Sequence, residues 1–215
     1  MLDLHRDHVT VHWPPSSKKD SVAEYIWNLD AALHSTEENT SCRVIALDVS
    51  VPEDCSLQAT VAALVFAGGG GVQVDRVTSA AGRHTPPEAE RFALQIGVLK
   101  AIADRAQSLV LFLDSMPAIE TLLDCSLRSG QIFSLDACQF ICPWFAQSPG
   151  YTITAWHVPS CFEWKIQHAT HDVATLLRIG AGTRPHCSLD FLCNASNEAA
   201  RRDWNLAQAL SEHVI

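Results

Sequence analysis

The chain has 215 residues, of which 47% are hydrophobic and 18% charged, and its formal net charge is −9. A chain of this length and apolar content buries a sizeable core, which excludes disorder throughout. Its apolar runs are far too short to cross a bilayer, and the N-terminus has neither the basic start nor the apolar stretch of a secretory signal. We therefore expect an intracellular protein, of the cytoplasm or nucleus, with no membrane partner.

The eight cysteines do not suggest a disulfide scaffold or a zinc site. No pair has the C-x-x-C spacing that zinc ligands commonly show. We expect free thiols, which are typical of a reducing compartment.

The N-terminal 40 residues are predicted to be an arm followed by a helix. Residues 1–19 are polar and rich in His and Pro, and they indicate a loose arm. Residues 20–34 place apolar side chains at helical spacing, and residues 35–41 form a polar linker.

Three strands are predicted next, over residues 43–51, 57–67 and 72–79. The glycine run at 68–71 lacks the Lys-Ser/Thr of a phosphate-binding loop, and a strand follows it. It predicts a hairpin turn, because glycine readily adopts the positive φ that such turns need.

The strongest helix signal covers residues 86–106. Thr85 is the expected N-cap, and Glu88 completes a capping box with it. Residues 108–113 form a continuous apolar run that ends at Asp114, as in a strand buried on both faces.

The remaining residues predict helices at 116–128 and 131–147, the second broken near Pro143, a last strand at 151–157, and helices at 163–179 and 188–213. Three antiparallel strands followed by two parallel strands with helical crossovers give an α/β fold, a mixed five-stranded sheet with helices on both faces. We expect three regions: an N-terminal arm and helix (1–40), a core domain (41–180) and a C-terminal helical extension (181–215).

Four acidic residues are singled out by their positions on these elements. Asp48 lies within an apolar strand, Glu90 in the first turn of the long helix, Asp114 at the end of the buried strand, and Asp172 on the helix after the last strand. Burying unpaired carboxylates costs several kcal/mol each, roughly. Cations would offset this cost, and oxygen ligands suit Mg²⁺ or Mn²⁺.

Over about residues 41–180 the sequence resembles the type 1 ribonuclease H family, and most closely the ribonuclease H domains of eukaryotic retroelements. The matching stretches are VIALDVS, TPPEAERFAL, VLFLDSMPAIETL and WHVPSCFEWKIQHATHDVATLL. The resemblance implies a ribonuclease H-like fold and an endonuclease that hydrolyses the RNA strand of RNA/DNA hybrids. It also implies two bound ions, Mg²⁺ or Mn²⁺. A reverse transcriptase domain upstream in a polyprotein is a further partner that it implies.

The same resemblance implies a role for each acid. Asp48 would bridge both ions, Asp172 would help hold the ion that activates water, and Glu90 and Asp114 would hold the ion at the leaving 3′ oxygen. The net charge of −4 over residues 41–180 becomes neutral once four carboxylates bind two divalent cations. Acidity therefore predicts weak, metal-dependent binding of a polyanion.

The sequence departs from the family's pattern at several positions. Val49 replaces the glycine after the first Asp, Pro86 and Pro87 precede Glu90, and Ser160-Cys161 replaces a Gly-His pair in the loop after the last strand. A basic, Trp-bearing protrusion is also absent, because residues 131–147 contain Trp144 but no Lys or Arg. One alternative is therefore a catalytically degenerate domain that binds nucleic acid or protein. A second is another nuclease of the same superfold, such as an exonuclease or an integrase-like enzyme.

Overall fold

The structure is a computed structural model, and its central element is a six-stranded mixed sheet with the strand order β1-β6-β5-β2-β3-β4. It describes residues 5–15, 19–34, 41–54, 56–68, 71–124, 126, 131–182 and 187–212. The strands are β1 (Val9–His12), β2 (Cys42–Ser50), β3 (Ala59–Ala67), β4 (Gln73–Gly82), β5 (Ser108–Leu113) and β6 (Thr152–His157).

The predicted order of three antiparallel strands and then two parallel strands is confirmed. β2, β3 and β4 form an antiparallel meander, while β5 runs parallel to β2 and β6 runs parallel to β5. At the end of the glycine run between β3 and β4, Gly71 has a φ of +63°, and a Cβ there would come within 2.6 Å of the His34 ring. Both facts explain why glycine is needed at this turn.

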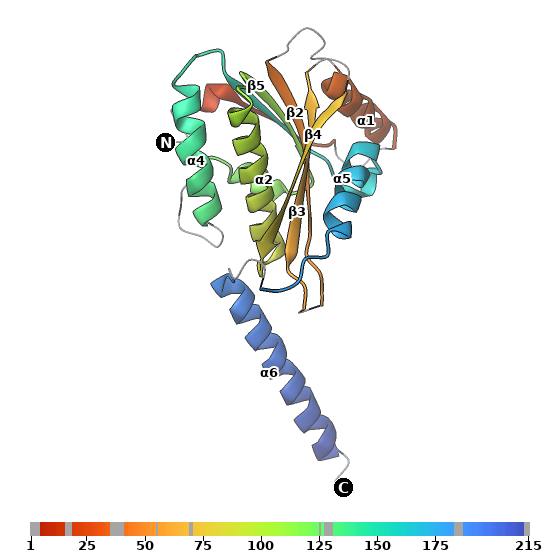
Figure 1. Cartoon of the computed structure of the whole chain (residues 1–215). Coiled ribbons are helices and arrows are strands. Elements are labelled where there is room, and N and C mark those ends of the chain that lie inside the picture. Colours follow the sequence, from red (N-terminus) through yellow and green to blue (C-terminus); the bar gives the residue numbers. More distant parts are fainter. Residues whose placement is uncertain are drawn as a thin grey trace.

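Helices cover both faces of the sheet, as predicted (Figure 1). α2 (Pro86–Ala103), α3 (Met116–Glu120) and α4 (Gln131–Phe145) pack on one face, against side chains such as Ile45, Leu47 and Leu111. α1 (Lys19–His34) and α5 (Lys165–Leu176) pack on the other face, against Val44 and Phe112. The odd-numbered and even-numbered residues of β2 thus point to opposite layers, as the two-residue period of a strand requires.

Three predicted elements differ in the structure. The N-terminal arm is not loose throughout, because β1 adds a sixth strand parallel to β6, with Val9 paired to Ile153. That pairing joins residues 144 positions apart, so no local sequence pattern predicts it. The helix predicted at 116–128 ends at Glu120. The predicted break near Pro143 is wrong, because α4 continues through this proline and ends two residues later. A proline at this position removes one backbone N–H donor, and the helix ends within one turn after it.

The C-terminal helix α6 (Leu189–Glu212) extends away from the sheet and its helices (Figure 1). No helix in the described part of the chain is both long and apolar enough to cross a membrane. The six described cysteines form no disulfide with one another; Cys55 and Cys125 lie outside the described residues.

Candidate active site

Two of the predicted acids lie side by side at the carboxyl ends of neighbouring parallel strands. The last register pair of β2 and β5 is Ala46 with Phe112, and Asp48 and Asp114 each follow two residues later. Adjacent strands lie about 4.8 Å apart, and residues two apart share a face. Both carboxylates therefore lie close together and face the α5 layer, as Ala46 and Phe112 do.

Asp48 is almost fully buried, and residues of α5 hold it. Gln167 Nε2 donates to Asp48 Oδ2 at 3.0 Å and to the Leu47 carbonyl at 3.0 Å, so its amide fixes this side chain against β2. His171 Nδ1 lies 3.6 Å from the same Oδ2 atom. Burial, and then the negative charge of Asp114, raise the pKa of Asp48 to about 6, although the bonds from Val49 and Gln167 and the charge of His171 oppose the rise.

Glu90 reaches the same place from near the start of α2. The Ser115 hydroxyl donates to Glu90 Oε2 and accepts from the Ala118 N–H, so one side chain both caps α3 and orients the glutamate. Burial raises the pKa of Glu90, the bond from Ser115 opposes this, and the charge of Asp114 adds to it.

Asp114 is held through its backbone. Its carbonyl accepts a hydrogen bond of 2.9 Å from His157 Nε2, at the end of β6. Burial raises the pKa of the Asp114 carboxyl too, while His157 and His171 oppose the rise. The three acids therefore form an electrostatically unfavourable cluster, in which each carboxylate is poorly hydrated and close to another negative charge.

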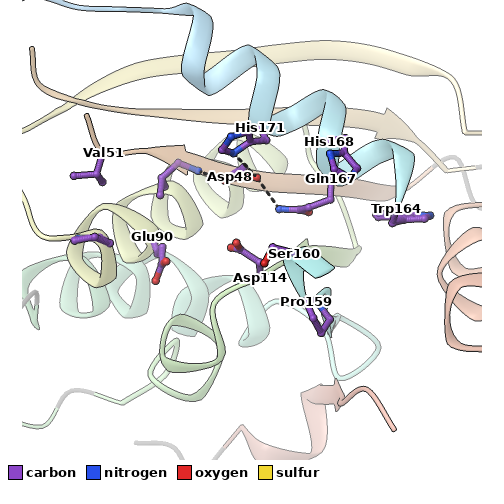
Figure 2. A pocket seen from close by; sticks show the side chains of 12 residues that line it. Asp48, Val51, Glu90, Asp114, Pro159, Ser160, Trp164, Gln167, His168 and His171 are labelled. Carbon is purple, nitrogen blue, oxygen red and sulfur yellow. Dashed lines mark hydrogen bonds and ion pairs between the residues drawn. The ribbon is translucent and has the colours of Figure 1, made fainter. Parts of the chain in front are cut away.

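These three acids line one cavity of about 440 Å³ together with one wall of α5 (Figure 2). Trp164, Gln167, His168 and His171 form that wall, at the spacing of one helix face. The remaining described lining residues are Val49, Val51, Pro86, Pro159 and Ser160, so no Lys or Arg is among the described residues that line the cavity.

The fourth predicted acid lies elsewhere on α5. Asp172 is exposed and is not among the lining residues of the cavity. Successive helical residues are rotated by about 100°, so the residue after His171 points away from the direction in which His171 points. The structure thus brings together Asp48, Glu90 and Asp114 and leaves Asp172 outside; a ligand role for Asp172 stays a prediction.

The structure also places four other residues that the sequence analysis named: Glu88, Pro86, Cys161 and Trp144. Glu88 takes the capping role, because its Oε2 atom accepts from the Thr85 N–H at 2.9 Å and from the Ser188 hydroxyl at 2.6 Å. Pro86 lines the cavity, whereas Cys161 is exposed and does not. Trp144 is 2% exposed and its indole N–H donates to the Ala106 carbonyl, so it is a core residue rather than a nucleic-acid contact.

Sequence reasoning missed Gln167, and it did not predict His171 as a residue of the site. The i, i+3, i+4, i+7 spacing from Trp164 to His171 was the available signal. It could not show which face of the helix meets Asp48, because that depends on how α5 packs on the sheet.

The carboxylate oxygens of the three acids are suitable ligands for divalent cations, although the three side chains do not surround a single point. Buried carboxylates with raised pKa values are hard oxygen donors whose repulsion a cation would relieve. Within the described ranges, however, no three His, Cys, Asp or Glu side chains are close enough together to hold an ion as they stand. Asp48 and Glu90 instead direct oxygens at Gln167 and Ser115.

No protein-family model matches this sequence, and no curated protein matches it either. Among solved structures, the chain is similar to the N-terminal RNase H domain of a Mycobacterium tuberculosis protein, with 17% identity and a TM-score of 0.47, covering 62% of this chain and 92% of that one. It is also similar to RNase H1 from the archaeon Halobacterium salinarum, with 19% identity and a TM-score of 0.44, covering 62% and 97% of the two chains. A third similar structure is the RNase H domain of prototype foamy virus, with 12% identity and a TM-score of 0.45, covering 63% and 94%. Likeness of this size does not say which reaction the chain performs.

Proposed function

We propose that this chain is a divalent-metal-dependent endonuclease that hydrolyses the RNA strand of RNA/DNA hybrids. The observation that carries the proposal is the convergence of Asp48, Glu90 and Asp114, from three separate elements, on one open cavity. Structural acids are normally paired with cations or exposed, whereas these three are partly or fully buried and line the same cavity.

Electrostatics makes the proposed activity depend on metal. The described lining of the cavity has three carboxylates and neither Lys nor Arg, so a phosphate group approaching it meets net negative charge. Divalent cations reverse the sign of this field and give the phosphate a place to bind. We therefore expect no steering of the substrate, and no cutting, when the ions are removed.

Each residue has a definite part in this proposal. Asp48, Glu90 and Asp114 hold the ions, with a fourth ligand from α5, where Asp172 is the residue that the sequence predicts. Gln167 positions Asp48, and Ser115 positions Glu90. When bound, two such ions activate a water molecule and stabilise the leaving 3′ oxygen.

A specific observation supports a second candidate, a degenerate domain that keeps the fold and binds nucleic acid or protein without cutting. Among the described residues, the acids are not arranged around a common point, and Asp48 is engaged by Gln167 and His171. In this case the acids would remain a destabilising remnant, and ions would not change the behaviour of the chain.

The experiment is a cleavage assay on an end-labelled RNA/DNA hybrid with Mg²⁺, with Mn²⁺ and with EDTA. We expect slow cutting of the RNA strand with either ion and none with EDTA. Asp114→Asn keeps the shape of the side chain but removes its charge, so it should lower the rate by at least about 100-fold, or about 2.7 kcal/mol of barrier.

The matched control is Asp136→Asn, a carboxylate of α4 that receives a hydrogen bond from Gln95 and does not line the cavity. This variant should cut at nearly the wild-type rate. The endonuclease proposal fails if the wild type shows no metal-dependent cutting, or if Asp114→Asn cuts as fast as the control. Tight hybrid binding without cutting would instead support the degenerate domain.

A further inference from the structure

The wall of α5 that faces the acids presents His171 where the sequence predicts an aspartate. His171 lines the cavity with Gln167 and His168, although its side chain is 55% exposed, whereas Asp172, which is also exposed, is outside the lining. Measured around the helix axis from Gln167, His171 lies at about 40°, His168 at about 100° and Asp172 at about 140°. Asp172 is therefore about 40° outside the lining arc and about 100° from His171. For Asp172 to enter the cavity, α5 would have to turn and withdraw Gln167 from its two hydrogen bonds to β2.

The position of His171 relative to Asp48 suits a shared ion. Its Nδ1 atom lies 3.6 Å from Asp48 Oδ2, which is longer than a hydrogen bond. Bonds from a divalent cation to nitrogen or oxygen ligands are about 2.1 Å each, so one ion can bind both atoms at this separation. The other ring nitrogen, Nε2, lies 3.4 Å from the Thr175 hydroxyl, an oxygen that can accept its proton and leave Nδ1 unprotonated.

A second, independent observation at the same cavity points to a ligand. Gln167 is 6% exposed, and its Oε1 atom has no hydrogen-bond partner anywhere in the described part of the chain. Its orientation is fixed, because Nε2 already donates to Asp48 and to the Leu47 carbonyl. Buried carbonyl oxygens are rarely left without a donor, and a water molecule on an ion beside Asp48 would supply one.

We propose that His171, and not Asp172, is the fourth protein ligand of the metal site, binding through Nδ1 an ion that it shares with Asp48. This inference rests on the proposed function, because it assumes that cations occupy the cavity. Gln167 then has two parts: its amide N–H orients Asp48, and its carbonyl oxygen accepts a hydrogen bond from water on the ion. Asp172 remains a solvent-exposed residue of the α5 surface.

The proposal predicts which ions the site favours. Imidazole nitrogen binds the later first-row transition metals better than it binds Mg²⁺ or Ca²⁺, and Mn²⁺ accepts both oxygen and nitrogen ligands. We expect Mn²⁺ to bind more tightly than Mg²⁺, and we expect the difference between the two ions to shrink when the imidazole is removed.

The test uses the full chain with Mn²⁺ alone, and it reads the ligand directly. Pulsed electron paramagnetic resonance of bound Mn²⁺ detects the ¹⁴N nucleus of an imidazole that coordinates the ion. The variants are His171→Gln, its cavity-wall control His168→Gln, Asp172→Asn and Asp114→Asn, each checked for folding by circular dichroism. Titration of free Mn²⁺ gives the affinity in parallel.

We expect a ¹⁴N signal in the wild type, in His168→Gln and in Asp172→Asn, and its loss in His171→Gln. Loss of the His171 ligand should weaken Mn²⁺ binding by at least about 10-fold. Mutation of a residue that only hydrogen-bonds to a metal ligand already weakens metal binding by about 10-fold or more. Asp172→Asn should stay within about 3-fold of the wild type, since the charge is exposed.

Other outcomes overturn the inference in distinguishable ways. If Mn²⁺ binds and Asp114→Asn abolishes this binding, but no ¹⁴N signal appears or the signal survives in His171→Gln, the role of His171 is wrong and the metal site stands. If Mn²⁺ does not bind, or if it binds equally well to Asp114→Asn, the metal site itself is wrong. The proposed function then fails with it.

Discussion

Replacing Asp48 with asparagine should make the metal-free protein more stable. This carboxylate is 7% exposed and lies beside Asp114, and its pKa rises from 3.8 to about 6. A carboxyl group whose pKa is raised by folding destabilises the folded state wherever it is ionised. The cost is absent below the unfolded pKa of 3.8, grows as the pH rises, and is complete above about 6.

The size of the effect follows from these values. Each tenfold change in proton affinity corresponds to about 1.4 kcal/mol, so ionised Asp48 costs the fold about 3 kcal/mol at neutral pH. Asparagine removes this cost but loses one bond. Its carbonyl can still accept from the Val49 N–H, but its amide nitrogen then faces the Gln167 amide, donor against donor. The lost bond costs about 1 kcal/mol, which leaves a net gain of about 2 kcal/mol.

The assay is urea denaturation in EDTA at neutral pH, repeated at several pH values between about 4 and 7. The free energy of unfolding of the wild type should fall relative to that of Asp48→Asn as the pH rises through this range. Asp172→Asn is the matched control, because the same chemical change at an exposed position should alter stability by less than about 0.5 kcal/mol.

A particular result would refute this reasoning. If Asp48→Asn is less stable than the wild type at neutral pH in EDTA, the carboxylate stabilises the fold. Its bonds from Gln167 and Val49 would then outweigh burial and the charge of Asp114. Equal stability of the two proteins across the whole pH range would mean that Asp48 is well hydrated and that the cavity holds no strained cluster.

Two further predictions concern the ions and the packing of α5. Saturating Mn²⁺ should raise the melting temperature of the wild type, by an amount that corresponds to about 2.7 kcal/mol at 100 times the dissociation constant, and it should have no such effect on Asp114→Asn; equal shifts in both proteins would place the binding outside the cavity. Trp164→Phe removes the 2.8 Å bond from the buried indole N–H to Asp30 Oδ1 on α1. It should destabilise the fold by about 1 kcal/mol in urea denaturation, and an unchanged midpoint would show that this bond contributes nothing.

Much of the core fold follows from local pattern. The apolar run before Asp114 predicts a strand covered on both faces, and β5 is covered by helices of both layers. Thr85 and Glu88 predict where α2 begins, because a capping box satisfies backbone groups within four residues. Residues near one another in the chain decide such features, so the sequence alone indicates them.

The site was predictable in part. Asp48 lies near the end of β2, Asp114 directly follows β5, and Glu90 lies near the start of α2. From these positions and the family resemblance, the sequence predicted that these three acids and Asp172 would meet. By itself, the sequence determined an α/β fold with a mixed sheet, and it predicted a cluster of four acids, of which three line one cavity. Only the tertiary structure decided the sixth strand, through the pairing of β1 with β6, and the choice of His171 over Asp172 for the cavity wall. The physical reason is that one residue along a helix turns a side chain by about 100°, and the packing of α5 on the sheet fixes which residue faces the acids.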